Sequence, residues 1–218
     1  MHIIKFFIFI CLFESCHSQR DDETFIPKEY QYPEDSILNG KTFVYQKSGT
    51  SEKNYTDFKL KIIDNKKWLI SVQYSADKTE DSVLTLNDKT KEIYSFSFND
   101  GKPLNGLVAQ DTVINDGTKL GKRIKRTVFK TDDYTSDNTS QLEYLKDTIF
   151  TWKSRKIDCI VMKAVSTTQL INNSDSSRQA LSSFHNLYFG KNIGLVKYST
   201  DYKEEHYMFE LTEINDIK

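Results

Sequence analysis

The chain from residue 40 onward consists of short runs rich in Val, Ile, Thr, Tyr and Phe, separated by clusters of Asn, Asp, Gly, Ser and Lys. Several runs alternate between large apolar and mostly polar residues, so that one face of an extended strand carries Trp68, Ile70, Val72 and Tyr74. This period of two is typical of an antiparallel sheet with one buried face. The sequence therefore predicts an all-β domain.

The predicted strands cover residues 41–46, 58–64, 67–75, 82–86, 92–98, 122–131, 148–152, 155–167, 184–189, 194–200 and 206–213. Residues 107–114 form a further strand or a loop that crosses the sheet. Short helices are predicted at 136–146 and 175–183. The run 155–167 carries apolar residues on both faces, which predicts a central strand. We expect a single curved antiparallel sheet, a half-barrel or open barrel, with one or two short helices.

The first residues of the chain have the order of an export signal. Lys5 is followed by an unbroken apolar run at 6–13, and the small residue Ser15 precedes Cys16. The run is well short of the roughly 20 apolar residues that a permanent membrane-spanning helix needs. We therefore predict a signal peptide over 1–15, a tether over 16–39 and a domain over 40–218. A remainder of about 200 residues fits one domain.

Two cleavage sites are consistent with this signal. Residues 13–16 resemble the lipoprotein box of bacterial lipoproteins, although Phe13 stands where Leu is usual and Glu14 is an unusual charge. Cleavage there would make Cys16 the lipidated amino terminus, anchored in the outer membrane on its periplasmic face or at the cell surface. The alternative is an ordinary cut after Ser18, which would give a secreted protein without lipid.

The residues that follow Cys16 also bear on location. They are a glutamine, a base and three acids, and they resemble the export signal of surface lipoproteins of the Bacteroidota type: Gln19, Arg20, Asp21, Asp22 and Glu23. The alternative is a solvated tether, in which acidic residues are common. The resemblance implies a surface address for a lipidated Cys16.

Candidates for catalysis are few. His185 and His206 are the only histidines of the predicted domain, and Cys159 is its only cysteine. They have no diagnostic spacing with one another or with the acids Asp158 and Glu205. We predict no catalytic residue, metal or cofactor, and we expect Cys159 to be buried and unreactive. A hydrolase that uses His185 or His206 stays open as an alternative.

Charge excludes one class of partner. Lys plus Arg total 30 and Asp plus Glu total 31, so no net charge attracts the chain to nucleic acid, and we expect a monomer without nucleic-acid partners. The one basic cluster, at 119–130, would place charge on both faces of a strand. This is typical of an exposed or edge strand. The alternative is contact with lipid phosphates or an acidic glycan.

Two stretches carry a family resemblance, YFGKNIGLVKY at 188–198 and WKSRK at 152–156. They resemble envelope proteins with the curved half-barrel of the LolA/LolB-like lipoprotein-sorting factors. The resemblance implies a concave apolar face that could accept an acyl chain, lined by Trp68, Phe96, Phe98 and Trp152. The alternative is that these aromatics form a filled core. We expect a non-enzymatic binding or structural module of the envelope, for a hydrophobic ligand or a partner protein.

Overall fold

The computed structural model describes residues 25–33, 36, 40–63, 66–75, 80–87, 92–96, 103–130, 132–202 and 205–216. Within these ranges, the side chains of residues 57–108, 202 and 205 are not described. The predicted signal peptide, Cys16 and the residues 19–23 lie outside the described residues. The same holds for Phe98.

The described residues form one short 3-10 helix, η1 (Lys28–Tyr30), and twelve strands. The strands are β1 (Lys41–Lys47), β2 (Lys53–Ile63), β3 (Lys66–Ser75), β4 (Glu80–Asn87), β5 (Glu92–Phe96), β6 (Pro103–Ile114), β7 (Lys122–Lys130), β8 (Tyr134–Trp152), β9 (Arg155–Asn172), β10 (Arg178–Gly190), β11 (Gly194–Tyr202) and β12 (Glu205–Asp216). No described helix is long and apolar enough to cross a membrane.

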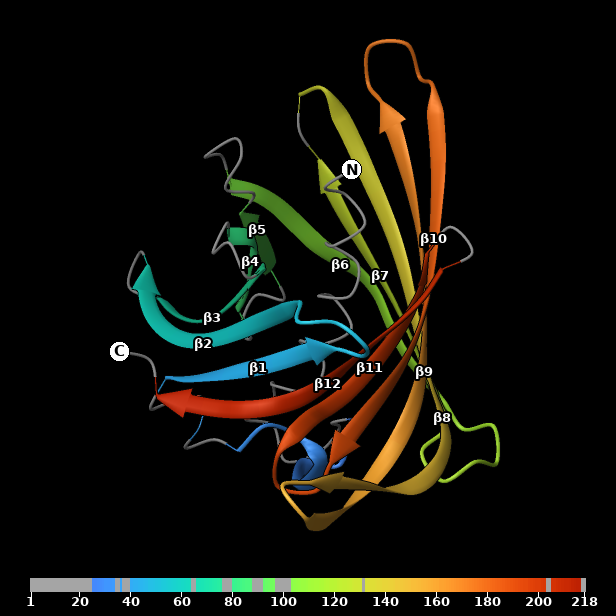
Figure 1. The fold of residues 1–218 in the computed structure, drawn as a ribbon. Coiled ribbons are helices and arrows are strands. Elements are labelled where there is room, and N and C mark those ends of the chain that lie inside the picture. The colour runs from blue at the N-terminus through green and yellow to red at the C-terminus, as the bar shows by residue number, and fades with distance from the viewer. Residues whose placement is uncertain are drawn as a thin grey trace.

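Each strand pairs antiparallel with its neighbours in sequence, so the strands form one sheet (Figure 1). The all-β class and the single curved antiparallel sheet are confirmed. In one respect the sheet differs from a half-barrel or open barrel. Strand β1 pairs with β12 as well as with β2, and this pairing makes the strand order a closed barrel. The long strands β8, β9 and β10 rise above the rest of the sheet in Figure 1.

Neither of the two predicted helices is present in the structure. Residues 136–146 lie in β8, and residues 175–183 form a turn and the start of β10. Strand β8 pairs with β9 along its whole length, from Tyr134 opposite Asn172 to Trp152 opposite Arg155. These long-range hydrogen bonds override the weak helical preference of the local sequence.

The basic strand β7 is not at an edge, because it pairs with both β6 and β8. Acidic residues on these neighbours balance its arginines. Arg123 forms a two-pronged ion pair with Asp111, with nitrogen–oxygen distances of 2.7 and 2.6 Å. Arg126 forms a similar pair with Asp137 at 2.8 and 2.5 Å. The prediction of an edge strand was therefore wrong. The sequence alone does not show that acidic residues of β6 and β8 pair with these arginines.

The core fills one end of the sheet, which we call the base. Its side chains come from the inner face of β1 and of β8 to β12, and they are at most 6 % exposed: Phe43, Tyr45, Leu142, Ile160, Met162, Ala164, Leu187, Phe189, Leu195, Tyr198, Phe209 and Leu211. The rings of Tyr198 and Phe209 stack with centroids 4.9 Å apart. In the described part of the base, the filled-core alternative holds.

The described amino-terminal segment, residues 25–33, packs against this base (Figure 1). Ile26 is fully buried, and the Tyr32 hydroxyl lies 2.8 Å from the Tyr45 hydroxyl, which donates to the Leu195 carbonyl at 2.9 Å. The backbone N–H of Asn192 donates to the Glu29 carbonyl. The folded domain therefore begins at least as early as residue 25, within the stretch predicted as a tether.

Gly194 tests this packing. Its φ is 91°, and a Cβ added there would lie 2.6 Å from ring atoms of Tyr32. Gly49 is a matched control, because its φ is 77° but an added Cβ meets no described atom within 4 Å. We expect Gly194→Ala to lower the free energy of unfolding by roughly 1–3 kcal/mol more than Gly49→Ala, since only Gly194→Ala adds an overpacking penalty to the backbone strain. Equal losses in urea unfolding would show that residues 25–33 do not pack on the base.

Candidate functional site on the inner face of the sheet

The inner face changes its chemistry along the long strands. Near the base, Leu142 of β8, Met162 of β9 and Leu187 of β10 belong to the apolar core. Side chains of the same face nearer the opposite end, which we call the rim, are small and polar. They are Thr127 on β7, Ser136, Asn138 and Ser140 on β8, Ser166 and Thr168 on β9, and Ser183 and His185 on β10. Residues two apart point to the same face, so these groups share the interior with the core.

The strand register brings the polar residues into rows. Thr127 is opposite Asn138, which is opposite Thr168. One step nearer the base, Ser140 is opposite Ser166 and Ser166 is opposite Ser183. A further step down β10, His185 lies between Ala164 of β9 and Thr200 of β11.

Five of these residues form what we call the inner polar site: Thr127, Asn138, Thr168, Ser183 and His185. Their side chains are between 0 % and 5 % exposed. The hydroxyls of Thr127, Thr168 and Ser183, both amide atoms of Asn138 and both ring nitrogens of His185 have no hydrogen-bond partner among the described residues. A buried polar group without a partner costs about 1–3 kcal/mol, and such groups are uncommon in folded proteins. Their concentration on one face makes this face the candidate site.

Electrostatics make the inner polar site uncharged at neutral pH. Burial lowers the pKa of His185 from its ordinary value of 6.5 to about 4, whereas the Ser199 backbone and the Asp201 carboxylate act weakly in the opposite direction. The Ser199 backbone lies near the His185 ring but forms no hydrogen bond with its nitrogens. The nearest described cation on the inner face is Lys125, opposite Ser140, which is 6 % exposed and has an interaction of its own. Neutral groups thus dominate the site.

The structure separates the residues considered for catalysis. His206 is exposed, and its Nδ1 lies 2.5 Å from an Asp201 carboxylate oxygen. Cys159 is 1 % exposed, as expected, and burial raises the pKa of its thiol to about 11. It pairs with Gly190, five residues along β10 from His185, a distance of roughly 17 Å. The described His, Cys, Asp and Glu residues form no cluster of three suited to a metal.

The predicted concave aromatic face is only partly described. Trp68 and Phe96 lie in β3 and β5, but their side chains are among those not described. Trp152 ends β8 and packs against the core, with Lys153 Nζ 4.9 Å from its ring centroid. Its indole nitrogen is buried and has no described partner. The sequence reading missed the inner polar site, although Ser136, Asn138 and Ser140 show the period of two that signals a strand face.

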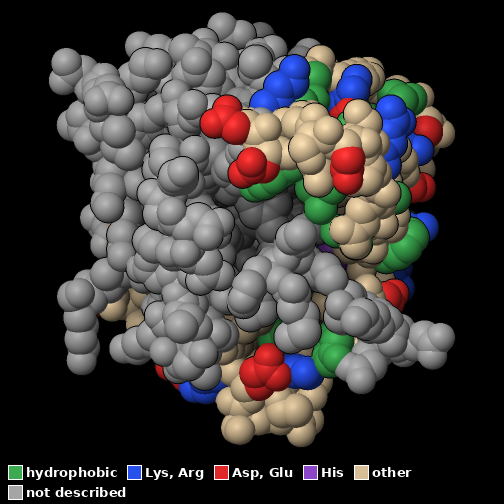
Figure 2. All heavy atoms as spheres, turned by 90° about the horizontal axis from the view of Figure 1, so that it is seen from above, with side chains coloured by type: hydrophobic (Ala, Val, Ile, Leu, Met, Phe, Trp, Pro, Cys, Tyr) green, Lys and Arg blue, Asp and Glu red, His purple; other side chains and the backbone are tan. Residues whose placement is uncertain are grey.

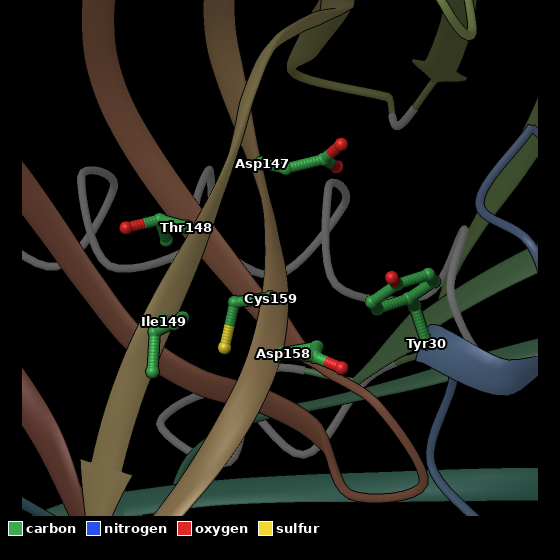
Figure 3. Close-up of a pocket in the computed structure, with 6 residues that line it drawn as sticks. All are labelled: Tyr30, Asp147, Thr148, Ile149, Asp158 and Cys159. Atoms are coloured by element: carbon green, nitrogen blue, oxygen red, sulfur yellow. The ribbon is translucent and has the colours of Figure 1, made fainter.

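A pocket lies outside the inner polar site. Figure 3 shows a pocket of about 370 Å³ lined by Tyr30, Asp147, Thr148, Ile149, Asp158 and Cys159. The Asp147 and Asp158 side chains point toward the side on which Tyr30 lies. Lys119 already pairs with Asp147 at 2.9 Å, and Ile149 is 60 % exposed. The pocket therefore lacks the enclosure of the inner polar site.

The rim end of the molecule carries charged side chains. In the view from above, Lys, Arg, Asp and Glu side chains lie around the described part of this end (Figure 2). The turn between β9 and β10 contributes exposed residues, among them Asp175 and Arg178. The polar interior is thus continued by a polar exterior at the rim.

Comparison with known proteins does not assign a function to the chain. Neither a protein-family model nor a curated protein sequence matches it. A candidate lipoprotein from Parabacteroides distasonis is 10 % identical with a TM-score of 0.42, covering 84 % of this chain and 97 % of that protein. A candidate exported protein with a YmcC-like fold from Bacteroides fragilis is 11 % identical with a TM-score of 0.43, covering 85 % and 98 %. Similarity at this level supports no conclusion about function, and the resemblance to LolA/LolB-like proteins stays a prediction.

His185 gives the site a measurable pH dependence. Because its pKa is lower in the folded protein, only the unfolded chain takes up this proton as the pH falls from about 6.5 to about 4. The folded protein should therefore lose on the order of 3 kcal/mol over this interval relative to a His185→Gln variant. Urea unfolding of both proteins between pH 7 and pH 4 measures this difference. Parallel stability curves would mean that His185 takes up a proton in the folded state as readily as in the unfolded chain.

Proposed function

We propose that this protein is a non-enzymatic binding module of the bacterial envelope, anchored by a lipid on Cys16, which takes its ligand at the inner polar site. The observation that supports a binding role is the group of buried side chains without described partners. A ligand that donates and accepts hydrogen bonds would satisfy these groups. Binding would then remove the free-energy cost of leaving them unpaired. Selection for stability alone would favour apolar residues at such positions.

The described inner face disfavours the hydrophobic ligand expected from the sequence. An acyl chain placed against Thr127, Asn138 and Thr168 would leave their polar atoms unsatisfied and would keep water from them. The apolar part of the described interior is already occupied by core side chains such as Met162 and Leu187. The binding role is therefore better served by a polar ligand.

The anchor and the site fit one arrangement. Phe25 is nine positions after Cys16 in the chain, and it packs at the base. A fully extended linker of this length spans roughly 30 Å. A lipid on Cys16 would hold the base toward the membrane and leave the rim, with the β9–β10 turn, free to face away from it. The inner polar site lies on the rim side of the core and would be approached from that direction.

The anchor is tested with a Cys16→Ala variant in the cells that produce the protein. We expect the native protein to incorporate labelled palmitate and to fractionate with membranes, and the variant to lose the label and to leave the membrane fraction. A variant that still fractionates with membranes would contradict the anchor. A mature native protein that begins at Gln19 and carries no lipid would support the secreted alternative.

The binding role is tested by native mass spectrometry of the protein isolated from its own cells. We expect an added non-covalent mass on the native chain, and an Asn138→Ala variant should lose at least nine-tenths of it because the amide contacts are removed. Thr139→Ala is the matched control, since Thr139 is the next residue of β8 and is exposed on the opposite face. Absence of any added mass, or equal loss in both variants, would count against binding at this site.

A further inference from the structure

We propose that the inner polar site binds a neutral saccharide, an inference that rests on the binding role proposed above and specifies its ligand. Five buried residues, whose side-chain atoms have no partner among the described residues, lie together on this face on four consecutive strands. The chemistry, charge and spacing of these groups each restrict the ligand.

The unpartnered groups are all able to donate and to accept hydrogen bonds. They comprise three hydroxyls, one primary amide and one imidazole. A carboxylate or a fully ionised phosphate group can only accept, so such a group could not donate to the acceptor atoms of Asn138 and His185. The hydroxyl of a sugar has the same dual capacity as the groups of the site. A polyhydroxylated ligand can therefore pair with each of them in either direction.

Charge points the same way. None of the five residues carries a carboxylate, and burial keeps the imidazole of His185 neutral above about pH 4. Lys125, beside the site on β7, is engaged in an interaction of its own. Arg123 and Arg126 of the same strand are paired with Asp111 and Asp137. An anionic ligand would thus meet no unengaged cation among the described inward-facing residues of β7, since Lys122 and Lys130 lie on the outer face.

The spacing suits a ligand larger than a single small group. Thr127, Asn138 and Thr168 lie in one row across three strands, and Leu181 of β10 continues that row. His185 lies four residues further along β10. At about 4.8 Å between strands and about 3.3 Å per residue, the groups spread over roughly 14 by 13 Å. This is the area of one or two sugar rings, with hydroxyls around their edges.

An aromatic residue completes the set. Phe129, the next inward residue on β7 after Thr127, is 1 % exposed and lies opposite Ser136. Small-molecule sites combine apolar and aromatic walls with a few placed polar groups. A sugar ring presents both kinds of surface, since its faces carry C–H groups and its edge carries hydroxyls. Phe129, which is engaged in a contact of its own, supplies an apolar wall beside Thr127.

The test uses the full mature chain on a printed array of neutral and acidic oligosaccharides, with palmitate in solution as a separate probe. We expect at least one neutral oligosaccharide to bind, and Thr168→Val to weaken it at least tenfold because a hydroxyl contact is lost. Thr139→Val, on the outer face of β8, should bind as the native protein does. Circular dichroism of each variant confirms that it is folded.

Three outcomes would contradict the proposal that the ligand is a neutral saccharide. Binding of acidic glycans alone would show that charge governs the site. Palmitate binding that Asn138→Ala abolishes, with no glycan bound, would identify an acyl ligand and would leave the binding role intact. An array without any bound neutral glycan would also refute the inference. If the protein isolated from its cells carried no added mass as well, the proposed binding role would fail with it.

Discussion

The pairing of β1 with β12 is the constraint on which the rest of the structure depends, because it joins the two ends of the sheet. Every inward side chain then lies in a shared interior, whatever its chemistry. Apolar residues at the base gain from leaving water, and the packed cluster around Met162, Leu187 and Tyr198 is the result. Polar residues nearer the rim lose their water in the same way. The favourable free energy of packing at the base offsets the cost of burying these polar residues.

The amino-terminal segment adds to the difference between the apolar base and the polar rim. Phe25, Ile26 and Tyr32 add apolar surface to the core, and the hydrogen bonds of Tyr45 to Tyr32 and to the Leu195 carbonyl join three parts of the chain. The base therefore contains the core, and the chain enters the folded domain there from its predicted anchor. The inner polar site lies on the other side of the core. The proposed anchor and the proposed ligand site would thus lie at different ends of one sheet.

The sequence predicted the strands well where large apolar residues alternate with polar ones. Strands β1, β9 and β11 begin at the predicted residues and extend one, five and two residues beyond the predicted ends. It failed at β8, because the inward residues Ser136, Asn138 and Ser140 are polar and resemble their outward neighbours. A period of two in apolar character cannot be seen where both faces are polar. Pairing with β7 and β9 decides the structure there, and pairing is not visible in a single sequence.

The site itself was harder to predict than the fold. His185 was recognised as a lone histidine, but its four companions are common residues. Ser183 is on the same strand, and the other three are on strands 17 to 58 residues away in the chain. Their significance comes from burial and from the absence of described partners, both of which depend on the register of four strands. Cys159, by contrast, was placed correctly in a buried position, because a lone cysteine in an apolar strand has few other favourable environments.

The central observation is that the buried groups of the inner polar site have no hydrogen-bond partner in the described part of the chain. The most direct measurement is the free energy of unfolding of ligand-free Thr168→Val beside Thr139→Val. The account predicts that Thr168→Val stabilises the protein by about 1 kcal/mol, since an unsatisfied buried hydroxyl is removed. The exposed control should change by no more than about 0.5 kcal/mol. A loss of about 1 kcal/mol or more in Thr168→Val alone would show that this hydroxyl already has a partner, and would contradict the account.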